Sequence, residues 1–458
     1  MSAPVLLWLR QDLRLADQPA LRAAIEQGPV IPLYVLDDEG PAAWAIGAAQ
    51  RWWLHHSLAA LDADLRARGS RLILRRGRAA EVVAAVAAQA GAARVHAIGH
   101  HEPWWIAAEA ALSQRLALVL HDGNQLAPPG QVRSAAGAPY RIFSPFWRAL
   151  CRMMPPPPPQ PAPEHIPAPA RWPTSDRLGD WALLPTAPDR ATGLAAEWTP
   201  GEAGARARLA DFADKVAGYG TARNLPSDEG SSRLSPHLHH GEISPAAVWH
   251  ATDGPQAASF HRELGWRDFA SGLVLQLPDY GSANGRAAFD RFPWRPLSDP
   301  AARDDFRAWT RGRTGYPVVD AGMRQLRAGG WMHNRVRMIA ASFLVKHLLI
   351  DWREGARWFW DTLVDADYGN NSVNWQWTAG SGVDSSPFGR IMAPLAQSAK
   401  FDAAGYIRRW VPELAGLSDD AIHDPHGAGV APRGYPAQRI GHRQARARAL
   451  EAGRTIRA

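Results

Sequence analysis

The sequence contains a single cysteine, Cys151, among 458 residues. An intramolecular disulfide is therefore excluded, and a cysteine-based metal cluster is not expected, which fits a reducing cytoplasm. We expect Cys151 to be a small buried apolar residue, and we assign no metal site to the chain. The amino-terminal MSAPVLLWLRQDLR has a short apolar run broken by charges, so it predicts neither a signal peptide nor a membrane span.

Acidic residues are fewer than basic ones, 44 against 51, which gives a net charge of +7. A basic chain fits an anionic partner such as nucleic acid, although charge alone does not separate DNA from other polyanions. Tyrosine is scarce beside tryptophan, with eight residues against 21. Stacking or electron transfer explains so many tryptophans better than packing does.

The first 125 residues alternate short apolar runs with helical segments, which predicts a doubly wound, five-stranded parallel sheet. A GxGxxG motif or phosphate loop is missing after the first run, so ordinary dinucleotide binding is not supported. The expected strands are VLLWL, VIPLYVL, RLILRRG, RVHAIG and LALVLHD, with helices starting near Pro19, Ala48, Ala79 and Pro103.

A proline-rich stretch, MMPPPPPQPAPEHIPAPARWP, must be extended and predicts a linker. From Glu202 onward the signals are almost entirely helical. We therefore predict an α/β domain over residues 1–130, an interdomain linker over 131–200 and a helical domain over 201–458.

The stretch from Asn334 to Leu349 contains neither glycine nor proline and predicts one helix with an apolar stripe facing protein. Its second face carries Asn334, Arg337, Met338 and Ala341. Such a face suits a flat ligand, but these residues alone favour an ordinary solvated surface.

Two carboxylates, Asp365 and Asp367, follow the apolar run WFWDTLV. Residues two apart do not share a helix face, so each needs its own partner: Arg337 for one, and a ligand amide or sugar hydroxyl for the other. Gly369 is expected to end the helix and turn the chain, with Asn370 in that turn.

Several motifs closely resemble the photolyase and cryptochrome family, and more narrowly class I type cyclobutane pyrimidine dimer DNA photolyases. These motifs are WMHNRVRM, FLVKHLLIDWREG, DTLVDAD, NNSVNWQW and QSAKFDAAGYIRRWVPEL, and the resemblance covers nearly the whole chain. It implies FAD held by the helical domain, which donates an electron under blue light to a flipped-out pyrimidine dimer. It also implies a second, antenna chromophore on the α/β domain, methenyltetrahydrofolate or 8-hydroxy-deazaflavin.

The resemblance assigns roles to individual residues of this sequence. The dimer pocket would be formed by Glu263, Trp266, Asn334, Met338 and Trp377, with Glu263 hydrogen-bonded to a thymine. A surface salt bridge is the alternative for Glu263. The electron-transfer tryptophans would be Trp294 outermost, then Trp352, then Trp375, and core packing is the alternative for each.

The same resemblance assigns cofactor and DNA contacts. FAD would be bound by Tyr219, Ser231, Ser232, Arg233, Leu234, Ser235, Phe260, Arg267, Trp331, Arg337, Asp365, Ala366, Asp367 and Asn371. DNA would be bound by Arg223, Glu263, Trp266, Asn334, Arg335 and Gln397.

Two regions depart from the family pattern. Gly389, Met392 and Ala393 stand where relatives carry an aromatic residue before Arg and Phe-Asn-Pro after Arg-Ile, so this edge is expected to differ. In the α/β domain, GHHEPWW matches no single antenna pattern. Asp37, Arg51 and Glu102 lie near the strand ends where an antenna pocket would form, but we expect each at the solvated surface.

Three rivals to dimer repair remain open. A cryptochrome photoreceptor would need the flavin without repair. A six-four photoproduct photolyase would need a histidine pair, of which Asn334 occupies one position and His333 is the remaining candidate. A cofactor-free helical nucleic-acid-binding protein would explain the charge alone. We expect a monomer in a bacterial cytoplasm, bound to damaged DNA and needing no obligate protein partner.

Overall fold

Five parallel strands form a sheet with the order β3-β2-β1-β4-β5 in the computed structural model, which describes residues 3–185, 191–386 and 391–456. This confirms the doubly wound, five-stranded parallel sheet that the alternating pattern predicts. The strands are β1 (Val5–Leu9), β2 (Val30–Leu36), β3 (Ile73–Arg76), β4 (Arg94–Ile98) and β5 (Ala117–His121).

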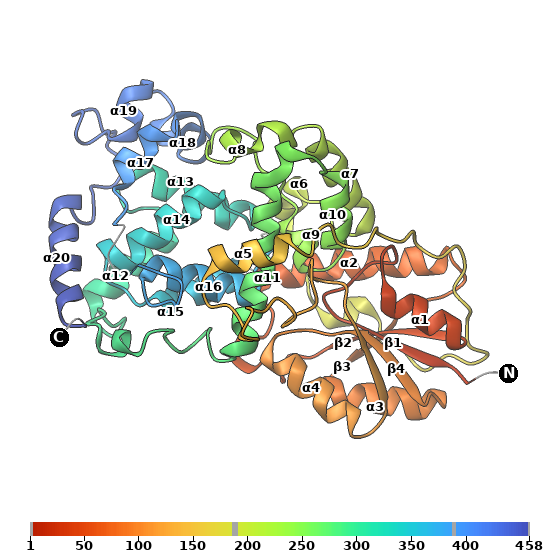
Figure 1. Cartoon of the computed structure of the whole chain (residues 1–458). Helices are drawn as coiled ribbons and strands as arrows, with labels where there is room; N and C mark the ends of the chain where they lie inside the picture. Colours follow the sequence, from red (N-terminus) through yellow and green to blue (C-terminus); the bar gives the residue numbers. More distant parts are fainter. Residues whose placement is uncertain (1–2, 186–190, 387–390, 457–458) are drawn as a thin grey trace. The chain divides into compact units, whose positions relative to one another are not determined.

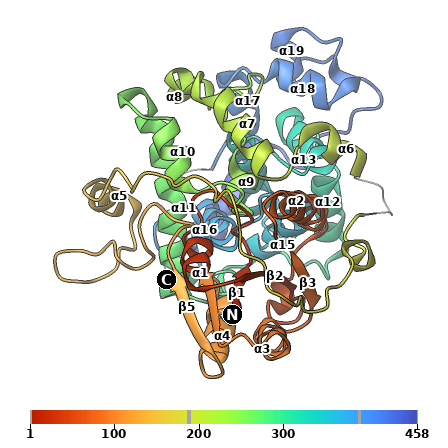
Figure 2. The same cartoon turned by 90° about the vertical axis from the view of Figure 1, so that its right-hand side faces the viewer.

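Helices cover both faces of the sheet, so its strands are apolar on both sides. In the central strand β1, Leu7 and Leu9 pack with residues of α1 (Pro19–Gln27) and α2 (Ala48–Arg66), including Leu21 and Leu58. The alternate residues of β1 pack on the other side, against α3 (Ala79–Ala90) and α4 (Pro103–Ser113). Figures 1 and 2 show these two helix pairs on opposite faces.

The chain divides into two compact units that interleave in sequence. The first unit comprises residues 1–216, 232–279 and 364–369, and the second comprises 217–231, 280–363 and 370–458. Besides the sheet and its four helices, the first unit contains α5 (Phe143–Cys151), α6 (Ala191–Glu197), α7 (Glu202–Ala213), α9 (Ser235–His239), α10 (Pro245–Ala251) and α11 (Ala258–Gln276).

Helices dominate the second unit, as the sequence predicts from residue 202 onward. Helix α13 packs against α14, α17 and α18. The helices are α8 (Tyr219–Ala222), α12 (Pro300–Thr310), α13 (Pro317–Gly329), α14 (Asn334–Ser342), α15 (Trp352–Thr362), α16 (Tyr368–Ala379, whose first two residues belong to the first unit), α17 (Pro394–Lys400), α18 (Ala404–Trp410), α19 (Asp419–His423) and α20 (His442–Arg454).

Two local predictions are wrong. The expected single helix from Asn334 to Leu349 changes at Phe343 into a π-helix that ends at His347. All five residues of the π-helix are buried, so it is surrounded by packing that apolar periodicity does not reveal. Cys151 is exposed rather than buried. It lies on the side of the short helix α5 opposite the buried face that includes Phe146 and Leu150.

The proline-rich stretch is irregular, as predicted, since residues 155–177 contain neither helix nor strand. Its carbonyl groups serve as acceptors for the first unit: Val30 N donates to Pro167 O at 2.8 Å, and the His250 ring lies 2.8 Å from Pro156 O. None of the described helices combines the length and the apolarity needed to cross a membrane.

A buried ion pair ties β1 to α4. Arg10 Nη1 and Glu109 Oε1 are 2.5 Å apart, and the two side chains are 1% and 9% exposed. The Arg10 guanidinium also donates to Ile98 O and lies 4.1 Å from the centre of the Trp8 ring. An ion pair, a backbone hydrogen bond and an aromatic ring therefore hold this cation.

We expect Arg10→Met to lower the free energy of unfolding by about 3–5 kcal/mol, because it leaves the Glu109 carboxylate buried without its counter-charge. Urea denaturation followed by tryptophan fluorescence measures the loss. Arg66→Met, which breaks the exposed Arg66–Asp62 pair, is the matched control and should change stability by less than about 1 kcal/mol. Equal losses in the two variants would contradict the argument.

Candidate active site

Helix α11 carries the first group of predicted site residues. Glu263, Trp266 and Arg267 are partly exposed, whereas Leu264 and Phe269 are buried in the core. The structure therefore places the three side chains on the accessible part of the helix, as their spacing predicts.

The Trp266 ring is held in one orientation by an aromatic partner that sequence analysis missed. It lies flat on the Phe143 ring, with centroids 3.6 Å apart and planes inclined by 7°. One face of the indole is covered by this stack, so only the other face and the edges remain for a ligand.

Arg267 has donor capacity that the described residues do not use. Its Nη2 donates to Leu238 O at 3.1 Å, but Nη1 is buried with no hydrogen-bond partner in the described part of the chain. Burial lowers the pKa of Arg267, and the carboxylates of Asp367 and Asp268 act in the opposite direction. A buried donor of this kind is satisfied by an acceptor from outside the chain or by water.

The segment 364–369 brings the two predicted carboxylates beside α9 within the first unit. Ser235 Oγ donates to Asp365 Oδ2 at 2.6 Å, and the His240 ring lies 3.2 Å from Val364 O. Tyr368 completes the anchoring, because its hydroxyl donates to Pro278 O at 2.8 Å. Two residues predicted to bind FAD, Ser235 and Asp365, are thus in direct contact.

The turn before α9 has an unusual backbone. Arg233 has a φ of 53°, which residues other than glycine rarely adopt. Leu234 N donates to Ser232 Oγ at 3.3 Å. The Arg233 guanidinium pairs with Glu197 at 2.8 Å and lies 4.4 Å from the Trp198 ring centre. The side chain of Arg233 therefore stabilises the turn, and its backbone provides the curvature that an anion site uses.

In the second unit, α14 begins with a histidine cap. His333 Nδ1 accepts a hydrogen bond from Arg335 N at 3.2 Å. Asn334 is exposed, and Arg337 and Met338 are partly exposed. The polar second face that the spacing predicts is therefore present, except that Ala341 is buried.

The predicted DNA-binding residues of the second unit lie on elements that contact one another. The Arg335 guanidinium donates to Asn224, at the end of α8, and lies 4.5 Å from the Phe401 ring centre, just after α17. Arg223 lies 5.1 Å above the Tyr219 ring on α8, and Gln397 is on α17. The contacts of Arg335 therefore connect α14 with α8 and α17, the elements at which Arg223 and Gln397 lie.

The expected chain reversal at Gly369 and Asn370 is wrong, because both residues lie in the first turn of helix α16. Gly369 allows close packing: a Cβ there would lie 3.2 Å from the backbone carbon of Ala270, a tight contact that a small backbone shift would have to relieve. The residue after Asn370, the buried Asn371, donates from Nδ2 to Ala356 O at 3.1 Å. Its carbonyl oxygen remains the acceptor that this side chain can offer to a ligand.

The three predicted electron-transfer tryptophans lie in the second unit. Trp294 is partly exposed, whereas Trp352 and Trp375 are buried. Trp352 Nε1 donates to Asn284 Oδ1 at 2.9 Å. A Cβ on Gly355 would lie 2.2 Å from the Trp375 ring, so only glycine fits beside this indole.

Sequence reasoning missed the side chains that surround the predicted residues. Trp309 and Phe359 contact Trp375 with ring centroids 6.3 and 4.9 Å away. Phe143 likewise contacts Trp266, and Asn284 contacts Trp352. Phe359 stands in the apolar run WFWDTLV, but its contact with Trp375 was not predicted, and Phe143, Asn284 and Trp309 were given no role.

The three residues considered for an antenna pocket differ in their exposure and contacts. Asp37 is partly exposed and accepts from Ala79 N at the start of α3, and Arg51 pairs with Asp38. The expected surface position is wrong for Glu102, which is 1% exposed, because it lies between the end of β4 and the start of α4. Of the residues that depart from the family pattern, Met392 and Ala393 are partly exposed, and Gly389 lies outside the described residues.

Family models match both halves of the chain. The model described as DNA photolyase matches residues 5–164, and the FAD binding domain of DNA photolyase matches residues 260–455. The fold and these two matches define a photolyase-type protein with an FAD-binding domain. The chain belongs to the DNA photolyase family.

Individual relatives support this membership along the whole chain. A deoxyribodipyrimidine photo-lyase of Agrobacterium fabrum is 47% identical over 98% of each chain. Cryptochrome-1 of Arabidopsis thaliana is 34% identical over 98% of this chain and 70% of its own length. The crystal structure of a bacterial class III photolyase from Agrobacterium tumefaciens superposes with a TM-score of 0.94 at 46% identity, covering 100% of this chain and 98% of that one.

Stability at acidic pH should report on His333. Burial, then Arg335 and Arg337, lower its pKa from 6.5 to about 4. Because the unfolded chain takes up this proton first, the contribution of His333 to stability is present above pH 6.5 and is lost as the pH falls toward 4. The expected loss is about 3 kcal/mol.

The variant His333→Asn keeps a side-chain acceptor at the helix cap and removes the titrating group. We expect its free energy of unfolding to fall less than that of the wild type between pH 6.5 and 4. The exposed His165→Asn is the control and should follow the wild type. Parallel pH profiles for all three proteins would refute the assignment.

Proposed function

We propose that this protein is a deoxyribodipyrimidine photo-lyase, which repairs cyclobutane pyrimidine dimers in DNA under blue light. The observation that carries the proposal is the face of α11, where Glu263 lies one turn from a tryptophan whose ring is fixed by Phe143. The 47% identity to an enzyme of that name supports the same reaction. Because the basic chain has a net charge of +7, it suits a DNA substrate.

FAD fits the residues that the sequence assigns to it. The buried Nη1 of Arg267 lacks an acceptor among the described residues, and the positive φ of Arg233 curves the backbone at the serine-rich turn. We assign FAD to the fourteen residues named from the resemblance, including Tyr219, Trp331 and Asn371. When bound, FAD supplies the electron that opens the dimer. The Asn371 carbonyl offers an acceptor to the flavin ring.

The side chains around the dimer position it and exclude water. Glu263 accepts or donates one hydrogen bond to a pyrimidine edge, and Trp266 contributes an apolar wall with its uncovered face. We assign contacts with the same dimer to Asn334, Met338 and Trp377. Photolyases are among the enzymes that take the target base out of the stack, and a damaged base costs less to extrude.

The binding of DNA backbone is assigned to Arg223, Arg335 and Gln397. Phosphate contacts hold the protein on the duplex without reading sequence, so lesion choice is left to the dimer pocket. Arg335 is suited to this role because Phe401 and Asn224 hold its guanidinium in place before DNA arrives.

We make finer proposals on the class, antenna, domains, assembly and location of the protein. The 46% identical structure is a class III photolyase, so class III is a better assignment than the class I type that the motifs suggested. The antenna is methenyltetrahydrofolate or 8-hydroxy-deazaflavin. We also propose the boundaries 1–130, 131–200 and 201–458, a monomer without an obligate protein partner, and a bacterial cytoplasm, which the single cysteine suits.

Glu263→Gln should lower repair of a thymine-dimer oligonucleotide by roughly tenfold to a hundredfold, the cost of one hydrogen bond to a charged group. The assay compares blue light with darkness for the chemically reduced protein, and FAD absorbance shows that the variant is loaded. Glu81→Gln, at an exposed glutamate of α3, is the control. A yellow protein that leaves the dimer intact in light would contradict repair and favour a photoreceptor, and repair of six-four lesions instead would identify that rival.

Trp352→Phe should slow light-driven reduction of oxidised FAD, while repair by chemically reduced protein stays unchanged. The reason is that phenylalanine keeps most of the buried apolar contact but is far harder to oxidise than tryptophan. Flavin absorbance during illumination measures reduction, and Trp172→Phe, whose indole packs on Arg71, is the control. Equal rates of flavin photoreduction in both variants would contradict a role of Trp352 in electron transfer.

A further inference from the structure

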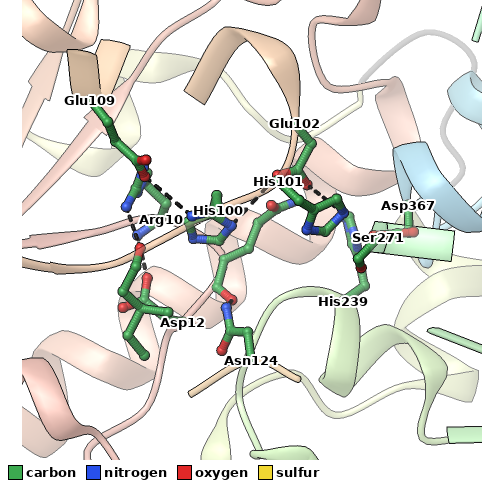
Figure 3. A network of polar contacts seen from close by, with 12 residues as sticks. Arg10, Asp12, His100, His101, Glu102, Glu109, Asn124, His239, Ser271 and Asp367 are labelled. Atoms are coloured by element: carbon green, nitrogen blue, oxygen red, sulfur yellow. Dashed lines mark hydrogen bonds and ion pairs between the residues drawn. The ribbon is translucent and has the colours of Figure 1, made fainter. Parts of the chain in front are cut away.

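A second cluster of titratable side chains lies in the first unit, where the chain leaves β4 and enters α4. His101 and Glu102 occupy this connection, and Asp367 and His239 approach it from the segment 364–369 and the end of α9 (Figure 3). His101 is 5% exposed and Glu102 is 1% exposed. Side chains of this polarity are seldom so deeply buried without strong partners.

Three buried atoms of this cluster lack hydrogen bonds within the described chain, although His100 and His101 form ion pairs with Glu102. Both ring nitrogens of His101 and Oε2 of Glu102 are buried there without a hydrogen bond. The nearest histidine nitrogens lie 3.6 and 3.9 Å from the Glu102 oxygens, which is beyond hydrogen-bond length. An ionised carboxylate in such a place needs a compensating positive charge.

The hydrogen bonding of His239 points to the same requirement. Its Nε2 lies 3.0 Å from Gln50 Oε1, which can accept a hydrogen bond from an Nε2–H; in a neutral ring of that tautomer, Nδ1 is the nitrogen that can bind a metal ion. That Nδ1 lies 3.9 Å from Asp367 Oδ2 and has no hydrogen-bond partner among the described residues. An ion bound at Nδ1 would give this nitrogen the partner it lacks, with an oxygen of Asp367 within reach as a further ligand.

The ligand atoms are close enough to share one ion. One nitrogen of His101 and one carboxylate oxygen each from Glu102 and Asp367 lie within 4.8 Å of one another. Bonds of about 2.0–2.2 Å to a central ion place ligand atoms roughly 3–4 Å apart, so small side-chain rotations complete the shell. A divalent ion would also compensate the charge of Glu102 and would add to the positive charge that Arg267 already places near Asp367, since the imidazoles bind as neutral ligands.

We propose that His101, Glu102 and Asp367, with His239 as fourth ligand, bind one divalent transition-metal ion of the zinc type. Mixed imidazole and carboxylate ligands suit such ions, whereas calcium and magnesium sites use oxygen ligands. Gln50 orients His239, as outer partners of metal-bound histidines do. The metal proposal does not rest on the proposed repair reaction, although the site shares Asp367 with the proposed FAD site. The sequence analysis predicted no metal site, so this proposal departs from that prediction.

The ion has a structural role. It joins the start of α4 to the end of α9 and to the segment 364–369, three parts of the first unit that are distant in sequence. Because a carboxylate has two oxygens, Asp367 can bind the ion with one and keep the other for the cofactor. The metal would thereby fix the position of Asp367.

The test uses full-length protein without an affinity tag, freed of metal by a chelator and titrated with Zn²⁺ against a chromogenic competitor. We expect one tightly bound zinc per chain by elemental analysis and a higher melting temperature with zinc. His101→Ala and Glu102→Gln each remove a ligand and should weaken zinc binding by more than about 100-fold, since loss of an outer partner alone costs 10–100-fold. His96→Ala, a buried histidine of β4 outside the cluster, should bind like the wild type.

Circular dichroism and the flavin content of each variant separate metal loss from misfolding and from loss of FAD. Should a ligand variant not fold, the Co²⁺ visible spectrum of the wild type still decides, because tetrahedral nitrogen and oxygen ligation gives a characteristic band. Substoichiometric zinc, or equal binding by wild type and ligand variants, would overturn the proposal. A protein that binds zinc tightly but does not repair DNA would leave this site standing and refute only the repair reaction.

Discussion

Buried charged groups that hydrogen-bond to backbone hold the loops of the first unit around its sheet. Arg14 donates to Gly123 O and Gly241 O, and Glu242 accepts from Gly201 N and the Trp53 indole. Each of these groups is buried and therefore costly unless all its partners are in place. Because their partners come from loops far apart in sequence, the cost of burial becomes a constraint on where each loop can lie.

The same constraint positions the candidate site. Asp268 is buried on α11, and its carboxylate accepts from the backbone N–H groups of Leu126 and Ala127. Burial raises the pKa of Asp268 to about 7, while those hydrogen bonds act in the opposite direction. The loop at residues 126–127 is thereby attached to the helix that carries Glu263 and Trp266. The scaffold and the site thus share one set of polar contacts.

The periodicity of apolar residues was sufficient to predict the sheet and the helices that cover it. Strands buried on both faces and helices with a single apolar stripe each produce a recognisable local pattern. The π-helix at Phe343 and the exposure of Cys151 could not be predicted, since both depend on packing by distant elements. The site residues were named from family motifs rather than from periodicity. Nothing local could reveal that Phe143 covers Trp266, or that Glu102 is enclosed, because these contacts join residues more than 100 positions apart or several separate elements.

The interleaving of the two units has an evolutionary consequence. Residues 217–231 of the second unit and 364–369 of the first are each enclosed in sequence by stretches of the other unit. A single recombination point therefore cannot transfer either unit complete to another gene. Modules joined end to end can be shuffled, lost or duplicated independently, but these two must be inherited together. Any relative that carries one unit is accordingly expected to carry the other.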